Sequence, residues 1–407
     1  MKKYFTFLFI AGCLLPAANS FAQGTWTPKA NLTGAARYGA VGFSIGTKAY
    51  IGTGFDGTTY LQDFWEWNSA TDVWTQKASF PGAGRFGAVG FSIGAKGYIG
   101  TGYTPSYQND FWEYDQVGDA WSPKTNFGGT ARYMAVGFSI GTKGYIGTGN
   151  DGIAPYTNDF WEWNQATDTW IPKAPFAGTG RSGATGFSIG AKGYIGTGLD
   201  GIGPFTQDFW EWDQASDAWS AKANFGGTAR FYAAGFSIGT KGYIGTGFDG
   251  MPRQDFWAWD QASDSWVQKA NLTGPARHLP ARFSIGTKGY IGTGWNSTTY
   301  FQDLWEYTPD SLMTGEEEFA AALQFSLYPN PAQQNITVEL PNQSRACGIV
   351  LTIFDLTGKE IYVQKNIFGK TEINCRNFSD GIYFVRVRNE SGQSWARKVF
   401  IDSLRKF

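Results

Sequence analysis

Residues 37–77 read RYGAVGFSIGTKAYIGTGFDGTTYLQDFWEWNSATDVWTQK, and five close variants of this segment follow it along the chain. Each copy holds four strand-like runs, which in the first copy are residues 40–45, 49–53, 64–67 and 73–77. A period of 47–49 residues with four strands per copy is typical of a β-propeller, in which each copy forms one blade. The motif Tyr-Ile-Gly-Thr-Gly marks the six copies, and it begins at Tyr50, Tyr98, Tyr145, Tyr194, Tyr243 and Tyr290.

The sixth copy ends near Tyr307 without the tryptophan strand that closes the other five. Residues 26–30, Trp-Thr-Pro-Lys-Ala, precede the first copy and have the missing sequence. We therefore expect this N-terminal strand to complete the last blade and close the ring, which removes the open edges of a linear array. The predicted fold class is all-β: a six-bladed propeller over residues 24–310, followed by a small C-terminal β-sandwich.

Both ends of the chain differ from the repeats. Residues 1–22 have the positive start, apolar run and small-residue cleavage site of a signal peptide. A lipoprotein processing box ending at Cys13 is the alternative interpretation, and no later apolar run is long enough to cross a membrane. Residues 311–325 are predicted to be a linker, and residues 326–407 contain strand patterns at 336–340, 350–354 and 382–387. Cys347 and Cys375 both lie in this last region, and the sequence leaves open whether they form a disulfide.

Four motifs in the last 80 or so residues point to export. Residues 325–331 (FSLYPNP), 354–359 (FDLTGK), 380–385 (DGIYFV) and 398–401 (KVFI) occur in this order. Together they resemble the C-terminal sorting domain, type A, of cargo proteins of the bacterial type IX secretion system. The resemblance implies contact with that secretion machinery, passage across the outer membrane, and a location at the cell surface or outside the cell. Whether the sorting domain is then cleaved off is left open.

The repeat itself resembles the kelch repeat. An arginine, a hairpin, a Tyr-Ile-Gly-x-Gly strand, and an aromatic residue seven positions before a tryptophan (Trp67 and Trp74) all correspond, although the family's double glycine is Gly-Thr-Gly here. Enzymes of the galactose oxidase type also have kelch blades, but their copper site needs two histidines and this chain has only His278. Bacterial sialic acid epimerases are six-bladed kelch proteins too, so an enzyme acting on sugars remains an alternative.

Composition narrows the possible functions further. Phe (33), Tyr (20) and Trp (18) make up 17% of the 407 residues, enough for a large buried core. A net charge of −1 gives no field that would attract nucleic acid. One histidine and three cysteines do not support a metal centre, so we expect no metal and no cofactor.

The variable part of the repeat indicates where a ligand would bind. The interval from the motif tyrosine to the Asp-Phe-Trp or Asp-Leu-Trp motif varies between 12 and 14 residues, whereas the other intervals are constant. Loops that vary on a rigid scaffold usually carry binding, and in kelch folds this loop shares a face with the repeat arginine. Aromatic residues are frequent there, and they either stack on a ligand or pack against neighbouring blades. The candidate binding residues on this face follow either the repeat arginine (Tyr38, Phe86, Tyr133, Phe231 and His278) or the Gly-Thr-Gly motif (Phe55, Tyr103, Asn150, Phe248 and Trp295).

Two arginines of the sixth copy complete the candidate site. Arg282 stands where the other five copies have glycine, and with Arg277 and His278 it suggests a basic cluster on the innermost strand. An unpaired charge near the crowded axis is costly, so Arg282 either anchors a ligand carboxylate or forms a salt bridge within the ring. By contrast, the Asp-Phe-Trp aspartates are expected to bind loop backbone, and the charged residues of the opposite hairpins are expected to be solvated.

Three functions compete. The favoured one is a secreted or surface binding protein whose aromatic face contacts a glycan or a protein, without catalysis and with no catalytic residues assigned. An enzyme acting on sugars and a passive adhesion scaffold are the alternatives, and the sequence names neither the ligand nor the oligomeric state.

Overall fold

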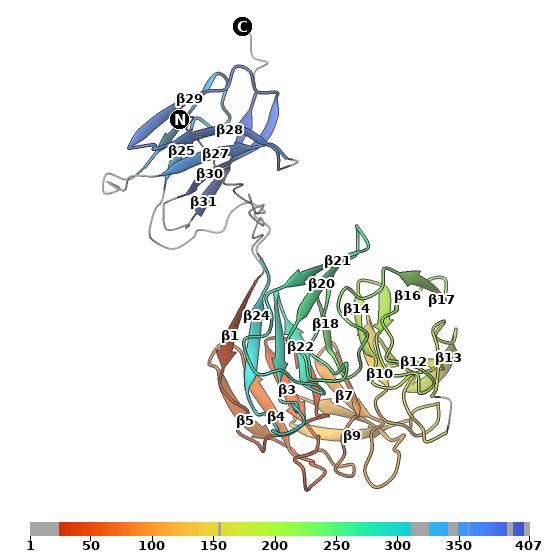
Figure 1. Cartoon of the computed structure of the whole chain (residues 1–407). Helices are drawn as coiled ribbons and strands as arrows, with labels where there is room; N and C mark the ends of the chain where they lie inside the picture. Colours follow the sequence, from red (N-terminus) through yellow and green to blue (C-terminus); the bar gives the residue numbers. More distant parts are fainter. Residues whose placement is uncertain are drawn as a thin grey trace, which may run out of the picture. The chain divides into compact units, whose positions relative to one another are not determined.

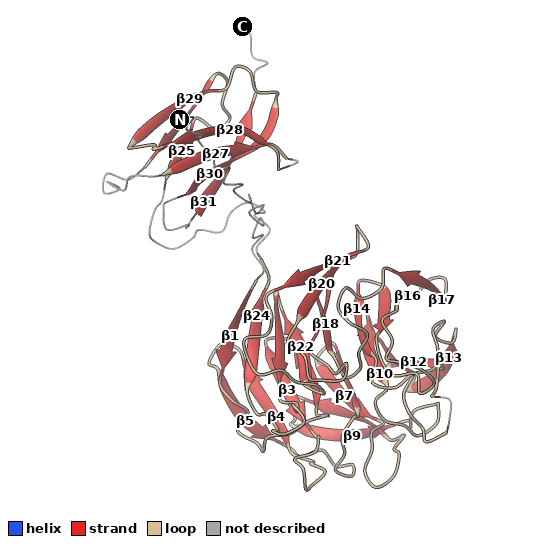
Figure 2. Ribbon diagram, viewed as in Figure 1, coloured by secondary structure: helices blue, strands red, loops and turns tan. Residues whose placement is uncertain are grey.

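A computed structural model describes residues 24–153, 156–310, 325–340, 349–356, 358–388 and 394–402. The chain divides into two compact units, residues 1–310 and 311–407 (Figure 1). The predicted signal peptide and most of the predicted linker lie outside the described residues. The described residues of both units form strands and loops, as Figure 2 shows.

The first unit consists of six four-stranded antiparallel sheets, which confirms the predicted six-bladed propeller. Blades 1 to 5 follow the chain order, from β2-β3-β4-β5 to β18-β19-β20-β21, with the first strand of each innermost. The strands of blades 1 to 3 are β2 (Val41–Ile45), β3 (Lys48–Gly52), β4 (Phe64–Asn68), β5 (Val73–Lys77), β6 (Val89–Ile93), β7 (Lys96–Gly100), β8 (Phe111–Asp115), β9 (Ala120–Lys124), β10 (Val136–Ile140), β11 (Lys143–Gly147), β12 (Phe160–Asn164) and β13 (Thr169–Lys173). Those of blades 4 to 6 are β14 (Thr185–Ile189), β15 (Lys192–Gly196), β16 (Phe209–Asp213), β17 (Ala218–Lys222), β18 (Ala234–Ile238), β19 (Lys241–Gly245), β20 (Phe256–Asp260), β21 (Ser265–Lys269), β22 (Ala281–Ile285), β23 (Lys288–Gly292) and β24 (Leu304–Thr308).

The sixth blade is completed by the strand that precedes the first repeat, as predicted. Strand β1 (Thr25–Lys29) pairs antiparallel with β24, with Trp26 opposite Tyr307, so the sheet order is β1-β24-β23-β22. In Figure 1 the red β1 lies alongside the cyan β24. The first and last blades also share one apolar cluster, in which Trp67 of β4 and Phe283 of β22 are both buried. The ring is therefore closed by strand pairing and by packing.

Neighbouring blades pack through aromatic side chains set against glycines. Phe43 of β2 lies against Gly97 of β7, where a Cβ atom would come within 2.4 Å of the ring. A Cβ at that distance would clash, so glycine at this point allows the blades to approach closely. Burial of these rings between blades accounts for most of the aromatic excess, including the fully buried Trp67 and its counterparts Trp163, Trp212 and Trp259.

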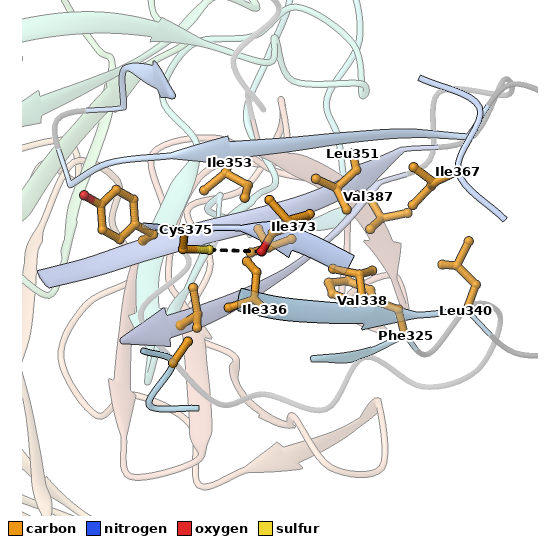
Figure 3. Close-up of a cluster of buried hydrophobic side chains, with 14 of the residues drawn as sticks. Phe325, Ile336, Val338, Leu340, Leu351, Ile353, Ile367, Ile373, Cys375 and Val387 are labelled. Atoms are coloured by element: carbon orange, nitrogen blue, oxygen red, sulfur yellow. Dashed lines mark hydrogen bonds between the residues drawn. The ribbon is translucent and has the colours of Figure 1, made fainter. Parts of the chain in front are cut away.

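The second unit has two sheets, β25-β26-β29 and β28-β27-β30-β31, around one core. Its strands are β25 (Ser326–Tyr328), β26 (Asn335–Glu339), β27 (Val350–Phe354), β28 (Glu360–Lys365), β29 (Lys370–Asn374), β30 (Gly381–Arg388) and β31 (Ser394–Ile401). Figure 3 shows the side chains that meet between the sheets, among them Ile336, Leu351 and Val387. Cys375 is buried there as a free thiol whose Sγ bonds to the carbonyl oxygen of Ile373, and Cys347 lies outside the described residues.

Candidate functional site

Two loops meet on one face of every blade. The residue after each repeat arginine forms an antiparallel bridge with the residue after each Gly-Thr-Gly, as Tyr38 does with Phe55. The other five pairs are Phe86 and Tyr103, Tyr133 and Asn150, Ser182 and Leu199, Phe231 and Phe248, and His278 and Trp295. The candidate residues of the two loops are thus paired side by side on one face, which we call the loop face.

Backbone hydrogen bonds hold the six blades together around the axis at this level. The amide of Gly39 donates to the carbonyl of Leu279 over 3.0 Å, and this contact links the first blade to the sixth. The same contact recurs between every pair of neighbouring blades, so six bonds form a closed ring. We call it the axial ring; its members are Gly39, Gly87, Met134, Gly183, Tyr232 and Leu279.

The repeat arginines are structural. The guanidinium of Arg37 is fully buried and binds both carboxylate oxygens of Asp63, over 2.5 and 2.6 Å. Arg277 makes the same contacts with Asp303 and also donates to the carbonyl of Thr293 over 2.8 Å. Its donors are committed to the protein, so we remove Arg277 from the candidate ligand anchors. The Asp-Phe-Trp aspartates therefore bind arginine, not the loop backbone as expected.

The turn aspartates of the opposite face were expected to be solvated, but they form hydrogen bonds within and between blades. Asp72 has a left-handed backbone (φ 54°), and its Oδ1 accepts hydrogen bonds from Trp67 Nε1 and from the amide of Ala30 in the neighbouring blade, each over 2.9 Å. Asp168, Asp217 and Asp264 make equivalent contacts. These side chains clamp adjacent blades together, although Asp217 is still 37% exposed.

A band of half-buried aromatic rings covers the loop face of blades 6, 1, 2 and 3. Tyr38 lies at its centre, nearly parallel to Trp295 and Tyr300 at centroid distances of 5.5 and 5.6 Å. Tyr38 also meets Phe55 and Phe86 edge to face. We call this band the aromatic arc; its members are Trp295, Tyr300, Tyr38, Phe55, Tyr60, Phe86, Tyr103, Tyr107 and Tyr133. Each ring packs on its neighbours and keeps part of its surface open to solvent.

The arc stops at the fourth blade. There the paired positions are Ser182, which is buried, and Leu199, and the neighbouring Asn150 of blade 3 is also not aromatic. On the other side of this gap, Phe231 packs against Phe205 and Phe248 at 4.7 and 5.6 Å. The loop face is therefore asymmetric, and the asymmetry follows the residues that differ among the copies.

The variable loops above blades 3, 4 and 5 end in exposed aliphatic side chains. Ile153 is 68% exposed, Ile202 80% and Met251 57%. The corresponding loops of blades 1 and 6 end in threonines held by Asp56 and Asn296, whose side chains accept hydrogen bonds from the backbone amides two and three positions later. Apolar and polar loop tips are thus separated around the ring.

His278 connects the arc to the aromatic rings of blade 5. Its ring lies 5.1 Å from that of Trp295 and 5.4 Å from that of Phe248, and the residue is 4% exposed. Neither ring nitrogen has a hydrogen-bond partner among the described residues. Burial lowers the pKa of His278 to about 4, so the imidazole is neutral at pH 7. The expected basic cluster therefore does not form around a charged histidine.

Arg282 lies apart from Arg277 and His278, in the channel along the propeller axis. A cavity of about 180 Å³ is lined by Arg282 and by residues of the innermost strand of every blade. A smaller cavity of about 40 Å³ lies at the axial ring and also includes Arg282 in its wall, whereas Arg277 and His278 line neither cavity. The sequence placed the three residues together because they are close in the chain, and the structure separates them.

In the described ranges, His, Cys, Asp and Glu side chains nowhere gather in a group of three that could bind a metal ion. Within the same ranges, no helix is long and apolar enough to span a bilayer.

Comparison with known proteins identifies the second unit and supports the fold of the first. Residues 326–402 match the family model described as "Secretion system C-terminal sorting domain". A solved structure titled "Structure of YjhT" superposes with a TM-score of 0.61 at 16% sequence identity, over 69% of this chain and 97% of the other, and so shows similarity of fold. No curated protein sequence matches the chain. We conclude that the chain is a six-bladed β-propeller followed by a C-terminal sorting domain of the type IX secretion system, which directs its export across the outer membrane to the cell surface or the medium.

Proposed function

We propose that the exported propeller is a binding protein whose aromatic arc holds a glycan. The observation that carries the proposal is the continuity of the arc, in which nine half-buried rings contact one another over four blades. Flat apolar faces stack on sugar rings, and tyrosine hydroxyls at their edges can bond to sugar hydroxyls. A chain of such rings suits an extended oligosaccharide better than a single small molecule.

The chemistry of the arc favours binding over catalysis. Burial raises the pKa of Tyr38 and of Tyr133 above the ordinary phenol value, so both stay protonated at neutral pH. They can donate and accept hydrogen bonds but do not act as bases there. An enzyme acting on sugars would need an acid and a base whose environments differ from those of the other copies, and the rings of the arc supply neither.

A second candidate function is binding of a protein partner through the aliphatic loop tips. Ile153, Ile202 and Met251 project from three successive blades and are the exposed large apolar residues of the variable loops. Clustered exposed apolar side chains are typical of protein interfaces. This candidate uses blades 3 to 5, whereas the glycan proposal uses blades 6 and 1 to 3, so the two can be separated by mutation.

A glycan array screened with the purified full chain tests the proposal. We expect wild type to bind a subset of glycans, Trp295→Ala to lose that signal, and Ile202→Ser to keep it. Phe368→Ala is the matched control, because it removes a 54% exposed ring from the sorting domain. Absence of binding to every glycan, or equal binding by Trp295→Ala and wild type, would overturn the glycan assignment. Loss of a protein partner on Ile202→Ser would support the second candidate.

A further inference from the structure

The wall of the axial channel is polar. Its larger cavity is lined by the free edges of the innermost strands, whose amides and carbonyls are not used by a further strand. One serine from each of these strands also lines it: Ser44, Ser92, Ser139, Ser188, Ser237 and Ser284. Three of the hydroxyls donate to the carbonyl of the serine in a neighbouring blade, as Ser44 does to Ser284 over 2.7 Å. The cavity therefore offers hydrogen-bond donors and acceptors around one cationic side chain, that of Arg282.

Arg282 has no partner for its charge among the described residues. No described carboxylate or other side chain forms an ion pair or hydrogen bond with it, and surrounding protein lowers the pKa of its guanidinium. The group stays protonated even so, because arginine is not deprotonated in proteins. The repeat arginines Arg37 and Arg277, by contrast, each bind an aspartate through two hydrogen bonds. The side chain is half-buried and borders the channel, so protein removes part of the water around its charge, and an anion that enters the channel would be attracted to it.

The neighbouring blade is built to accept the arginine. In blades 3 and 5 the equivalent residues are Gly137 and Gly235, where a Cβ would lie 1.9 Å from Val89 Cγ1 and 2.4 Å from Thr185 Cγ2 in the preceding blade. The same relation between neighbouring blades places Ala234 next to Arg282. Alanine has no γ-methyl group, so it does not collide with the Cβ atom of the arginine. Space for the Arg282 side chain therefore comes from Ala234 of the preceding blade, at a position where blades 1 to 4 have valine or threonine.

We propose that the axial channel is a binding site for a small organic anion with one carboxylate group, held by Arg282. The planar guanidinium pairs with both oxygens of a carboxylate, and one such group balances the single charge. The cavity has ample room for a small acid such as acetate or lactate. None of the residues that line this cavity belongs to the aromatic arc, so the two sites are distinct.

The anion reaches Arg282 from the hairpin side of the propeller. On the loop side, the axial ring narrows the channel with the side chains of Met134, Tyr232 and Leu279, which replace the glycines of the other three blades. All three have left-handed backbones, with φ between 54° and 59°, and such strain persists where the surroundings hold it in place. The larger cavity extends away from this ring, toward the hairpins that follow the serines.

Isothermal titration of the full chain with sodium acetate and sodium lactate tests the proposal, at constant ionic strength and with sodium chloride and sodium phosphate as comparison anions. We expect saturable binding of at least one carboxylate to wild type. Arg282→Gly restores the residue of the other five copies and should weaken binding at least tenfold. Arg282→Lys, which keeps the charge but loses the planar fork, should weaken it by a smaller factor.

Two further variants make the result decisive. Arg282→Met fills the space without charge and should also lose binding, which covers the case that Arg282→Gly does not fold. Trp295→Ala should bind the carboxylate as wild type does, so failure of the glycan proposal would leave this one standing. No saturable binding to wild type, equal binding by wild type and Arg282→Met, or equally tight binding of chloride would overturn the proposal.

Discussion

The indole Nε1 of Trp26 donates a hydrogen bond over 2.9 Å to the carbonyl oxygen of Ala270, 244 positions further along the chain. Trp26 belongs to the strand that completes the sixth blade, and Ala270 follows the last strand of the fifth. The ring of Trp26 also lies 5.0 Å from both Phe256 and Tyr307. The N-terminal strand thus joins two blades, and closure of the ring depends on it.

Deletion of residues 24–30 should therefore abolish the cooperative thermal unfolding of the propeller, because it exposes the edge of β24 and removes a buried aromatic contact. Differential scanning calorimetry of the full chain measures this. Thr25→Ala, a change at an exposed position of the same strand, is the control and should shift Tm little. An unchanged transition after the deletion would show that the ring does not need this strand.

The ion pair between the buried Arg181 and Asp208, whose side chain is 32% exposed, predicts a pH-dependent stability. Burial by itself would raise the pKa of Asp208, but the hydrogen bonds and charge of Arg181 outweigh it and hold the pKa below its ordinary value. Asp208→Asn leaves Arg181 buried without a counter-charge and should destabilise the propeller by about 3 kcal/mol at pH 7. The carboxylate contributes fully above the unfolded-state pKa of about 4, and its contribution disappears as the pH falls through the lower folded-state pKa.

Urea unfolding of wild type and Asp208→Asn at pH 7 and at pH 3 checks both parts of this prediction. The two proteins should differ strongly at pH 7 and less at pH 3. A difference that stays constant with pH would mean that the charge of Asp208 is not the source of the stabilisation.

His278 predicts a second pH dependence. Burial lowers its pKa to about 4, below the unfolded value of about 6.5, so the folded state favours the neutral ring. Stability is therefore complete above pH 6.5 and falls by up to about 3 kcal/mol as the pH drops toward 4, because the unfolded chain takes up the proton first. His278→Phe introduces the residue found at this position in blades 2 and 5 and should remove this part of the loss. Equal pH profiles for the variant and wild type would show that His278 is not buried as described.

Much of the fold could be predicted from the repeat. The spacing of the Tyr-Ile-Gly-Thr-Gly motifs gave the blades, and the resemblance of residues 26–30 to Trp121 and its neighbours gave the closing strand. Strand limits differ from the predicted ones by at most one residue, as at β2, because only the ladder of hydrogen bonds decides where a strand ends. The kelch assignment and the signal peptide stay predictions.

The candidate site was harder to predict, because side-chain partners far apart in the chain decide it. The residues around Arg277 in the sequence do not show that Asp303, 26 positions later, binds its guanidinium and occupies the donors that a ligand would need. Nor does the sequence show that His278 is paired with Trp295 on the loop face whereas Arg282, four positions later, lines the axial channel. The sequence does offer one signal for the space around Arg282. Ala234 of the preceding blade is smaller than the equivalent Val41, Val89, Val136 and Thr185.

The central claim, that the aromatic arc is the binding surface, is tested most directly by titrating the strongest glycan from the array into the wild-type full chain and four variants of it. Tyr38→Ala and Trp295→Ala each remove one of two stacked rings, whereas Phe368→Ala and Val117→Ala remove exposed apolar side chains elsewhere. Removal of one stacking ring should cost about 1–3 kcal/mol, so we predict a Kd raised about fivefold or more relative to wild type for the first two variants and unchanged for the other two. The same Kd for wild type and all four variants, each with an unchanged Tm, would contradict the claim.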